Sequence, residues 1–289
     1  MTTVTFSNRH SSPIVRVFEG LRALNASWDV KMGRPLSGEG WIIGEQLADA
    51  STGPLNELLR RIGSRLRTTD RRTIAALYAM RFGWASAIAI APYAKFNCVP
   101  HIGLGNVSLK FKESTFFEQT AIHEPRGFFV GGSSGVDHPS VTFVASREAL
   151  LRSLRDELTH QAAPVVEALY AWSGFARRGA WGMLTSSWTA HFTSLAASEL
   201  DQSDVLPLLD DFFEGADLAA DMRPRLHIVR YRNRAHVYQT RASCCRFYLV
   251  PEGQLCASCP LVAHEERVAR NLAWMKKQVD ESSGRRAHS

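Results

Sequence analysis

The sequence predicts an α+β fold: a helical N-terminal part, a small antiparallel sheet, a helical middle, and a C-terminal hairpin with a cysteine loop and a closing helix. Three observations predict it. Apolar residues recur every three or four positions on both sides of residues 106–146, which is helical spacing. Between those limits, short runs alternate or are rich in strand formers. A second pair of strand-like runs then leads directly into four of the five cysteines.

The N-terminal third carries three helical patterns. Residues 15–24 and 55–66 place apolar residues at helical spacing, and residues 73–90 form a longer apolar-rich segment. Asp70 suits the position before the first turn of that segment, because its carboxylate accepts backbone N–H groups there. Pro92 is expected to end the same helix.

Residues 106–146 are predicted to form strands. Residues 107–112 alternate with a period of two, and residues 141–144 are rich in β-branched and aromatic side chains. The glycine-rich run 131–135 between them is a turn signal; it lacks the spacing and the lysine of a phosphate-binding loop. We expect a short antiparallel sheet.

Helical spacing returns over residues 147–200. The helix is expected to begin at Ser146, and Pro164 is expected to mark a kink or boundary within it. Residues 204–213 predict one further short helix.

The last part of the chain predicts a hairpin and a closing helix. Residues 226–231 and 235–240 read as strands on either side of a turn at Asn233. Residues 261–279 form an amphipathic helical pattern, and residues 281–289 are a polar tail.

No repeat or low-complexity linker divides the 289 residues, of which 45% are hydrophobic, enough for a substantial core. We interpret residues 1–240 as one α+β body and residues 241–289 as an appended module that carries the cysteines.

Charge and hydropathy restrict the location and the partners. The net charge is +6, and a basic stretch over residues 223–241 is interleaved with aromatic residues; its alternation also describes a surface-facing β-ribbon, and no nucleic acid is expected. The start of the chain is polar and the longest apolar stretch, 85–91, is short, so neither export nor a transmembrane segment is expected. In the cytoplasm thiols stay reduced and available to metal.

The cysteine cluster indicates metal or redox chemistry. Cys244 and Cys245 are adjacent, ten residues follow, and Cys256 and Cys259 then form a Cys-x-x-Cys pair. Adjacent side chains on a strand point to opposite faces, so both reach one centre only if the backbone turns there. Spacing alone leaves an iron–sulfur cluster, zinc and redox-active thiols open. Cys98, which stands alone, is expected to be a small buried residue rather than a ligand.

Residues 241–261 closely resemble the C-terminal signature of the FhuF-type ferric siderophore reductases, a Cys-Cys-x10-Cys-x2-Cys motif followed by proline. Upstream, the stretch from Arg178 to Gly182 is similar to the Arg-x-x-Trp-Gly stretch of that family. The resemblance implies a 2Fe-2S cluster held by Cys244, Cys245, Cys256 and Cys259. It also implies cytoplasmic one-electron reduction of Fe(III) in imported siderophores, which are expected to be of the hydroxamate type.

A reductase of this kind needs an electron donor, and we expect a ferredoxin-like or flavin-dependent one, because no dinucleotide-binding fingerprint is present. Arg241 and Arg246 flank the vicinal cysteines and are candidates to stabilise negative charge there. Substrate contact is assigned to Arg178, Trp181 and Trp188, although the tryptophans suit core packing equally.

Two alternatives remain. One is a non-catalytic iron–sulfur protein that binds siderophores or senses redox state, and the other is a binding module stabilised by zinc.

Overall fold

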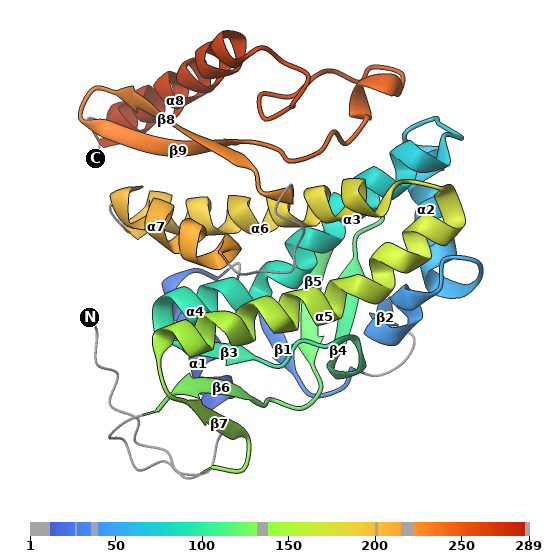
Figure 1. Cartoon of the computed structure of the whole chain (residues 1–289), viewed down its shortest axis with the longest axis vertical. Coiled ribbons are helices and arrows are strands. Elements are labelled where there is room, and N and C mark those ends of the chain that lie inside the picture. The colour runs from blue at the N-terminus through green and yellow to red at the C-terminus, as the bar shows by residue number, and fades with distance from the viewer. Residues whose placement is uncertain are drawn as a thin grey trace. The chain divides into compact units, whose positions relative to one another are not determined.

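The computed structural model describes residues 12–26, 28–35, 40–131, 138–199, 202–214 and 222–286. It confirms the α+β class, with helices in the N-terminal and middle parts, small sheets, and a C-terminal hairpin followed by a helix (Figure 1). The chain divides into two compact units. The first comprises Met1–Leu47 and Ile88–Gln161, and the second comprises Ala48–Ala87 and Ala162–Ser289. The predicted boundary between residues 240 and 241 stays a prediction.

The first unit contains two small sheets. The four-stranded sheet has the order β1-β5-β4-β2, with β1 and β5 parallel and the other pairs antiparallel. The three-stranded sheet has the order β3-β6-β7, with β6 and β7 parallel. The strands are β1 (Val30–Met32), β2 (Trp41–Ile43), β3 (Cys98–Pro100), β4 (Val107–Phe111), β5 (Phe117–Ile122), β6 (Gly127–Val130) and β7 (Val141–Val144).

These sheets correct the expectation of one antiparallel sheet. Strands β4 and β7 lie where the sequence predicts them, but they belong to different sheets, and each sheet contains a parallel pair. Alternation reports which face a residue occupies and carries no information about the direction of the neighbouring strand. Of the predicted turn 131–135, Gly131 donates to the Val144 carbonyl oxygen, and the other four residues lie outside the described residues.

Helix α1 (Pro13–Leu24) confirms the first predicted helix, and the apolar segment 73–90 is divided. It forms α3 (Arg71–Ser86), a 3₁₀ turn η2 (Ala87–Ala89) and α4 (Ile90–Phe96), so the expected stop at Pro92 is wrong. Pro92 lies in the first turn of α4, where a backbone N–H has no partner within the helix and its loss costs nothing.

A helix boundary at Pro164 is also wrong, because α5 (Arg147–Ser173) continues through this residue, and the alternative expectation of a kink there stays a prediction. The helical segment instead divides at Gly174, whose φ of 65° lies in the left-handed region that ends helices, and α6 (Arg177–Glu199) follows. The beginning is as predicted, since the Ser146 hydroxyl accepts the Ala149 N–H at 3.1 Å.

The second unit is built on α3 and α6, which pack closely against each other, together with α2 (Gly53–Arg65) and α7 (Gln202–Phe213). Gly83 of α3 permits the close approach, because a Cβ there would lie 2.7 Å from the Cβ of Ser187 on α6. The Asp70 carboxylate accepts the Arg72 N–H at 3.2 Å and so caps α3, as predicted. Short 3₁₀ turns elsewhere are η1 (Gly44–Ala48) and η3 (Leu104–Asn106).

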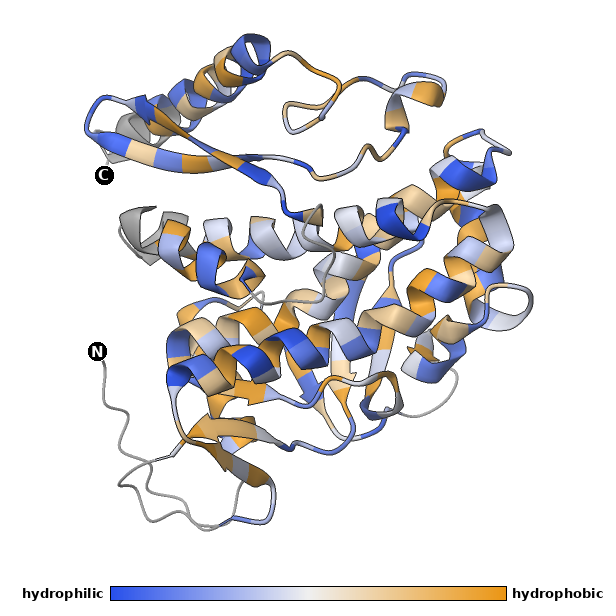
Figure 2. Ribbon diagram, viewed as in Figure 1, coloured by the Kyte–Doolittle hydropathy of each residue, from blue (hydrophilic) through white to orange (hydrophobic). Residues whose placement is uncertain are grey.

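The hairpin of β8 (Arg225–Tyr231) and β9 (Arg234–Thr240) confirms the prediction, with a two-residue turn at Arg232 and Asn233. Its strands alternate between hydrophilic and hydrophobic residues (Figure 2). One face packs on α8 (His264–Arg286) in a small hydrophobic cluster. We call this cluster the hairpin core; its members are Val229, Met275 and Val279, with Tyr231, Tyr238, Val268 and Leu272 packed against them.

The bounds of α8 differ from the prediction at both ends. Residues 261–263 are not helical, because the chain is still turning after Cys259, where the Val262 N–H donates to the Cys259 carbonyl oxygen at 3.3 Å. At the other end the helix continues to Arg286, through most of the expected polar tail.

Within the described residues, one segment, Arg71–Phe96, is long and apolar enough to cross a membrane by length and composition. However, 89% of its apolar window is buried inside the protein, and the core helix of a soluble protein passes the same test. The segment is therefore weak evidence for a membrane span.

Candidate iron–sulfur site

The four clustered cysteines lie on the segment that connects β9 to α8, within the second unit. The segment leaves the hairpin at Thr240 and returns beside its own starting point, because the Arg241 N–H donates to the Ser258 carbonyl oxygen at 2.9 Å. This bond brings the two cysteine pairs, separated by ten residues in the sequence, to the same place.

The vicinal pair lies at a turn of the backbone, as its adjacency requires. Arg246, which follows Cys245, adopts φ 59° and ψ 10°, and this left-handed conformation reverses the chain into the 3₁₀ turn η5 (Phe247–Leu249). Cys245 is buried and Cys244 is half-buried. The chain direction therefore changes immediately after the two thiols.

The second pair lies in a tight turn. The Cys259 N–H donates to the Cys256 carbonyl oxygen at 3.0 Å, which places both side chains on one side of the turn. Cys259 is buried and Cys256 half-buried, so each pair contributes one enclosed and one more accessible sulfur.

Backbone N–H groups favour the thiolate forms of these cysteines. The Arg246 N–H donates to Cys244 Sγ at 3.3 Å, and the backbones of Phe247, Ser258 and Leu261 act to lower the pKa values of Cys245, Cys256 and Cys259, respectively. Such hydrogen bonds favour the charged form of the acceptor, here the thiolate. The thiolate is also the form that binds metal, so the backbone fits a ligand set of four thiolates.

The sulfurs themselves interact in two cross-pairs, Cys245 with Cys256 and Cys244 with Cys259. The hydrogen bond from Cys245, together with Arg241, lowers the pKa of Cys256 to about 5, while the same bond and burial raise the pKa of Cys245. Among the described residues, no three His, Cys, Asp or Glu side chains form a group that could hold one metal ion. The thiols thus stand as two linked pairs, each joining one half of the motif to the other.

Arg241 brings positive charge to these sulfurs. Its guanidinium donates to Cys256 Sγ, to the Ser258 hydroxyl at 3.0 Å and to Met80 Sδ at 3.3 Å. Burial disfavours its charge, but the neighbouring Cys245 and Cys256 outweigh burial and raise its pKa. Its predicted role beside the cysteines agrees with this placement.

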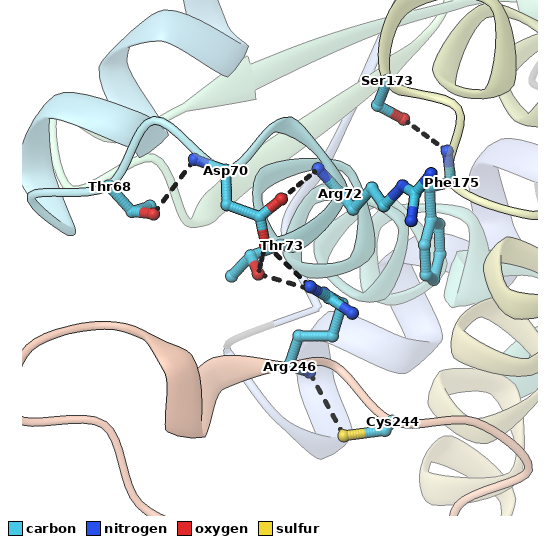
Figure 3. Close-up of polar contacts among 8 residues, drawn as sticks. All are labelled: Thr68, Asp70, Arg72, Thr73, Ser173, Phe175, Cys244 and Arg246. Carbon is cyan, nitrogen blue, oxygen red and sulfur yellow. Dashed lines mark hydrogen bonds and ion pairs between the residues drawn. The ribbon is translucent and has the colours of Figure 1, made fainter.

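Arg246 acts differently from Arg241, because its side chain points away from the cysteines (Figure 3). The guanidinium donates to the Asp70 carboxylate at 3.0 Å and to the Thr73 hydroxyl at 3.2 Å, at the start of α3, while its backbone N–H serves Cys244. Arg246 thereby fastens the vicinal pair to the first turn of α3.

The stretch from Arg178 to Gly182 lies on α6 and holds the residue before the vicinal pair. The Ser243 hydroxyl donates to the Gly179 carbonyl oxygen at 2.7 Å, and a Cβ on Gly182 would lie 2.9 Å from the Ser243 Cβ. The Ser186 hydroxyl also accepts the Ala242 N–H at 3.2 Å. Gly182 therefore allows the cysteine segment to lie directly on α6.

The loop between the pairs closes on a glycine. The Gly253 N–H donates to the Val250 carbonyl oxygen at 2.9 Å, and a Cβ at Gly253 would lie 1.9 Å from the Phe247 carbonyl oxygen. Only glycine fits this turn, which sets the path from η5 to Cys256.

The three predicted substrate-contact residues all lie on α6 but differ in exposure. Trp188 is fully buried, donates to the Ser86 hydroxyl at 2.7 Å and packs edge-to-face on Trp181. Arg178 is exposed and lines a pocket beside the cysteine segment. Cys98 is buried in the first unit, as predicted, and burial raises its pKa.

Several residues around the site were not predicted from the sequence. The partners of Arg241 and Arg246 on α3 and at its cap are Met80, Asp70 and Thr73. They lie more than 160 positions earlier in the chain, and no sequence pattern predicts contacts over such a distance. The basic stretch 223–241 did carry a signal, because Arg223 and Arg225 line the same pocket as Arg178.

With this geometry described, comparison with known proteins is informative. Over its cysteine segment the chain is similar to the FhuF 2Fe-2S C-terminal domain. The family model matches residues 241–261, the segment that holds all four thiols. The FhuF match indicates a 2Fe-2S cluster as the cofactor and links the chain to siderophore-related iron metabolism. A search of curated proteins finds no match.

Proposed function

We propose that this protein is a ferric siderophore reductase whose 2Fe-2S cluster is held by Cys244, Cys245, Cys256 and Cys259. The observation that carries the proposal is the match to the FhuF 2Fe-2S C-terminal domain, supported by the donors that reach sulfur, the Arg246 N–H at Cys244 and the Arg241 guanidinium at Cys256. Four thiolates are a donor set suited to a 2Fe-2S cluster.

The chemistry of such a cluster suits the task. A bound 2Fe-2S cluster supplies one electron at a time, which is the number needed to convert Fe(III) to Fe(II). Siderophores hold Fe(III) through hard anionic oxygen atoms, and these bind Fe(II) less well because its charge is lower. The residues of the site contribute by holding negative charge, since the backbone donors and the Arg241 guanidinium all point to sulfur.

The proposal includes a setting that the resemblance implies. The reaction takes place in the cytoplasm, and the electron comes from a ferredoxin-like or flavin-dependent donor. Hydroxamate siderophores, the expected substrate type, stay a prediction.

The test begins with protein purified without oxygen, in which iron and acid-labile sulfide are counted and the visible spectrum is recorded before and after dithionite. Reduced protein, freed of dithionite, is then mixed with a panel of ferric siderophores, and reoxidation and Fe(II) are followed together. We expect about two irons and two sulfides per chain, bands that bleach on reduction, and repeated turnover with a donor.

Variants make the assignment specific. Cys256→Ser is expected to lose the visible bands, whereas Cys98→Ala, the matched control in the other unit, is expected to keep them. A protein that contains zinc and no acid-labile sulfide would contradict the proposal and favour a binding module stabilised by zinc. Stoichiometric oxidation without turnover would favour a binding or sensing protein.

A further inference from the structure

The second unit contains a pocket of about 800 Å³, within the range of small-molecule sites. Its walls come from residues 48–51, from α2, from the first residues of α3 and α6, and from the last part of α5. Tyr170 and Trp172 line it together with four alanines, while Ser51 and Asn56 add neutral polar groups. We call it the aromatic pocket. Tyr170 is 41% exposed, so aromatic surface is available to a ligand there.

One part of the lining is an ion pair stacked on an aromatic ring. Arg177 donates to both carboxylate oxygens of Glu167 at 2.6 to 2.8 Å, and its guanidinium carbon lies 3.7 Å from the centroid of the Tyr170 ring. The hydrogen bond from Arg177 lowers the pKa of Glu167, so both partners are charged at neutral pH. Their two charges cancel.

The other two charged residues of the lining also have partners. Asp49 accepts the Ser51 N–H at 2.8 Å, the Ser51 hydroxyl at 2.6 Å and the Thr52 hydroxyl at 3.0 Å. The Arg71 guanidinium carbon lies 5.2 Å from the centroid of the Trp172 ring, and Arg71 donates to the carbonyl oxygen of the same residue at 3.3 Å. Two arginines and two acidic residues therefore line the aromatic pocket, and the net charge of its lining is zero.

A short route of bonds connects the aromatic pocket to the vicinal cysteines through the beginning of α3. Arg71 of the lining follows Asp70 in the chain, and the Asp70 carboxylate accepts from the Arg246 guanidinium at 3.0 Å (Figure 3). The Arg246 N–H in turn donates to Cys244 Sγ at 3.3 Å. Two hydrogen bonds and the residues between them thus join the lining to a cysteine sulfur.

A second route runs through the beginning of α6. Arg177 lies two positions before Gly179, whose carbonyl oxygen accepts the Ser243 hydroxyl at 2.7 Å. Ser243 is followed directly by Cys244. The two helix ends that fasten the vicinal pair therefore also supply the two arginines of the aromatic pocket.

We propose that the aromatic pocket binds the ferric substrate as an electrically neutral trihydroxamate chelate and places its Fe(III) within reach of the cysteine site. Three hydroxamates, each with one negative charge, cancel the charge of Fe(III). A charged chelate would lose hydration in a lining that offers no net counter-charge. A neutral chelate loses less, and it buries its apolar surface against the aromatic rings.

This inference rests on the proposed function, since it names the substrate class and the binding site of that reaction. In the reaction the reduced cluster loses one electron, Fe(III) becomes Fe(II), and no covalent bond forms between protein and chelate. The hydroxamate oxygens then release the weaker-bound Fe(II).

Binding is tested without turnover by replacing Fe(III) with Ga(III), which has the same charge and is not reduced. Calorimetric titration of the cluster-loaded protein compares a Ga(III) trihydroxamate that has no charged side chains with a Ga(III) triscatecholate, whose charge is −3. We expect the neutral chelate to bind at least about tenfold more tightly. We also expect added salt to leave its affinity unchanged, because the neutral chelate carries no net charge for salt to screen.

Two tyrosines of the second unit provide matched variants. Tyr170 and Tyr248 are 41% and 40% exposed, and of the two only Tyr170 lines the aromatic pocket. Tyr170→Ala is expected to weaken the neutral Ga(III) chelate by about tenfold, and Tyr170→Phe to keep most of the affinity because the ring remains. Tyr248→Ala is expected to leave the affinity unchanged. The visible spectrum and circular dichroism of each variant verify its cluster and its fold.

The neutrality of the lining is tested on α5. Glu167→Gln leaves two arginines and one acidic residue in the lining, which then carries one net positive charge. The affinity for the anionic Ga(III) chelate is expected to rise by about threefold, while that for the neutral chelate stays the same. Glu148→Gln, which removes an exposed ion-pair partner on the same helix but outside the lining, is expected to change neither affinity.

Three results would overturn the inference: an anionic chelate that binds as tightly as the neutral one, equal effects of Tyr170→Ala and Tyr248→Ala, or no response of the anionic chelate to Glu167→Gln. The proposed function is judged separately, by reoxidation of the reduced protein. If a ferric trihydroxamate reoxidises the protein but Ga(III) binding does not depend on Tyr170, the reductase stands and the aromatic pocket falls. If the neutral Ga(III) chelate binds through Tyr170 but no ferric chelate reoxidises the protein, the pocket stands and the reductase falls.

Discussion

Arg241 connects three features of the site at the scale of single residues. Its side chain reaches the Cys256 sulfur, the Ser258 hydroxyl of the Cys-x-x-Cys turn and the Met80 thioether on α3. A fixed positive charge at sulfur stabilises the more negative, reduced state of an iron–sulfur centre. Arg241 is therefore a positioning and charge-holding residue for the proposed reaction.

We predict that Arg241→Gln lowers the reduction potential of the cluster by tens of millivolts, because the charge and the hydrogen bond to Cys256 are both lost. The measurement is a spectroelectrochemical titration of the visible bands. Arg246→Gln is the matched control, since its guanidinium points to Asp70 and Thr73 rather than to sulfur. Equal shifts in the two variants would show that side-chain contact with sulfur does not set the potential.

The cysteine motif could be predicted from the sequence because the ligands are neighbours in the chain. The spacing of Cys244, Cys245, Cys256 and Cys259, and the need for a turn after the vicinal pair, are both local properties. The different roles of Arg241 and Arg246 could not be predicted, since both flank the motif and only their distant partners distinguish them.

At the scale of elements, the beginning of α3 serves two purposes. The Asp70 carboxylate caps the helix through the Arg72 N–H and also accepts from Arg246, which carries the vicinal cysteines (Figure 3). Thr73 reinforces both contacts, because its hydroxyl bonds to Asp70 and accepts from Arg246. The N-terminus of α3 thereby anchors the cysteine segment, which lies more than 160 positions further along the chain.

We predict that Asp70→Ala lowers the free energy of unfolding by about 1 kcal/mol through loss of the cap. Asp70→Asn is expected to cost less, because an amide still caps α3 and a half-exposed ion pair contributes about 0.2–1 kcal/mol. Urea unfolding followed by circular dichroism measures both. Equal losses in the two variants would show that the charge pair with Arg246, rather than the cap, is what Asp70 contributes.

The elements themselves show what periodicity predicts and what it does not. The hairpin, α2 and the cap at Asp70 lie where their patterns indicate. The helix end expected at Pro92 and the boundary expected at Pro164 were wrong, since a proline interrupts a helix only where a backbone N–H is needed and its ring has no room. Strand direction in the two sheets was not predictable, because it depends on partners far away in the sequence.

At the scale of the whole molecule, each unit contains its own buried residues, and the second is sensitive to acid. His191 on α6 packs against the ring of Trp84, with the ring centroids 4.2 Å apart. Burial lowers the pKa of His191 to about 3. Between pH 6.5 and about 3, the imidazole of His191 is therefore neutral in the folded protein and protonated in the unfolded chain.

We predict that, between its ordinary pKa of 6.5 and about 3, His191 lowers the free energy of unfolding by about 1.4 kcal/mol per pH unit as the pH falls. The unfolded state binds the extra proton in this window, so stability decreases toward acid. His191→Gln is expected to flatten the dependence of the urea midpoint on pH between 6 and 4. His160→Gln, an exposed position, is the control, and an unchanged slope in His191→Gln would contradict the prediction.

The hairpin core has a consequence for how the protein is made. It joins β8 and β9 to α8 through Val229, Met275 and Val279, so both ends of the cysteine segment are held by contacts that involve none of the four cysteines. Ser243 and Arg246 add two further attachments that are also independent of metal. We therefore expect the newly synthesised chain to fold before the cluster is assembled, with its four thiols already held as two pairs. In that order of events, iron and sulfide bind to an already folded protein, and their supply, rather than folding, limits maturation.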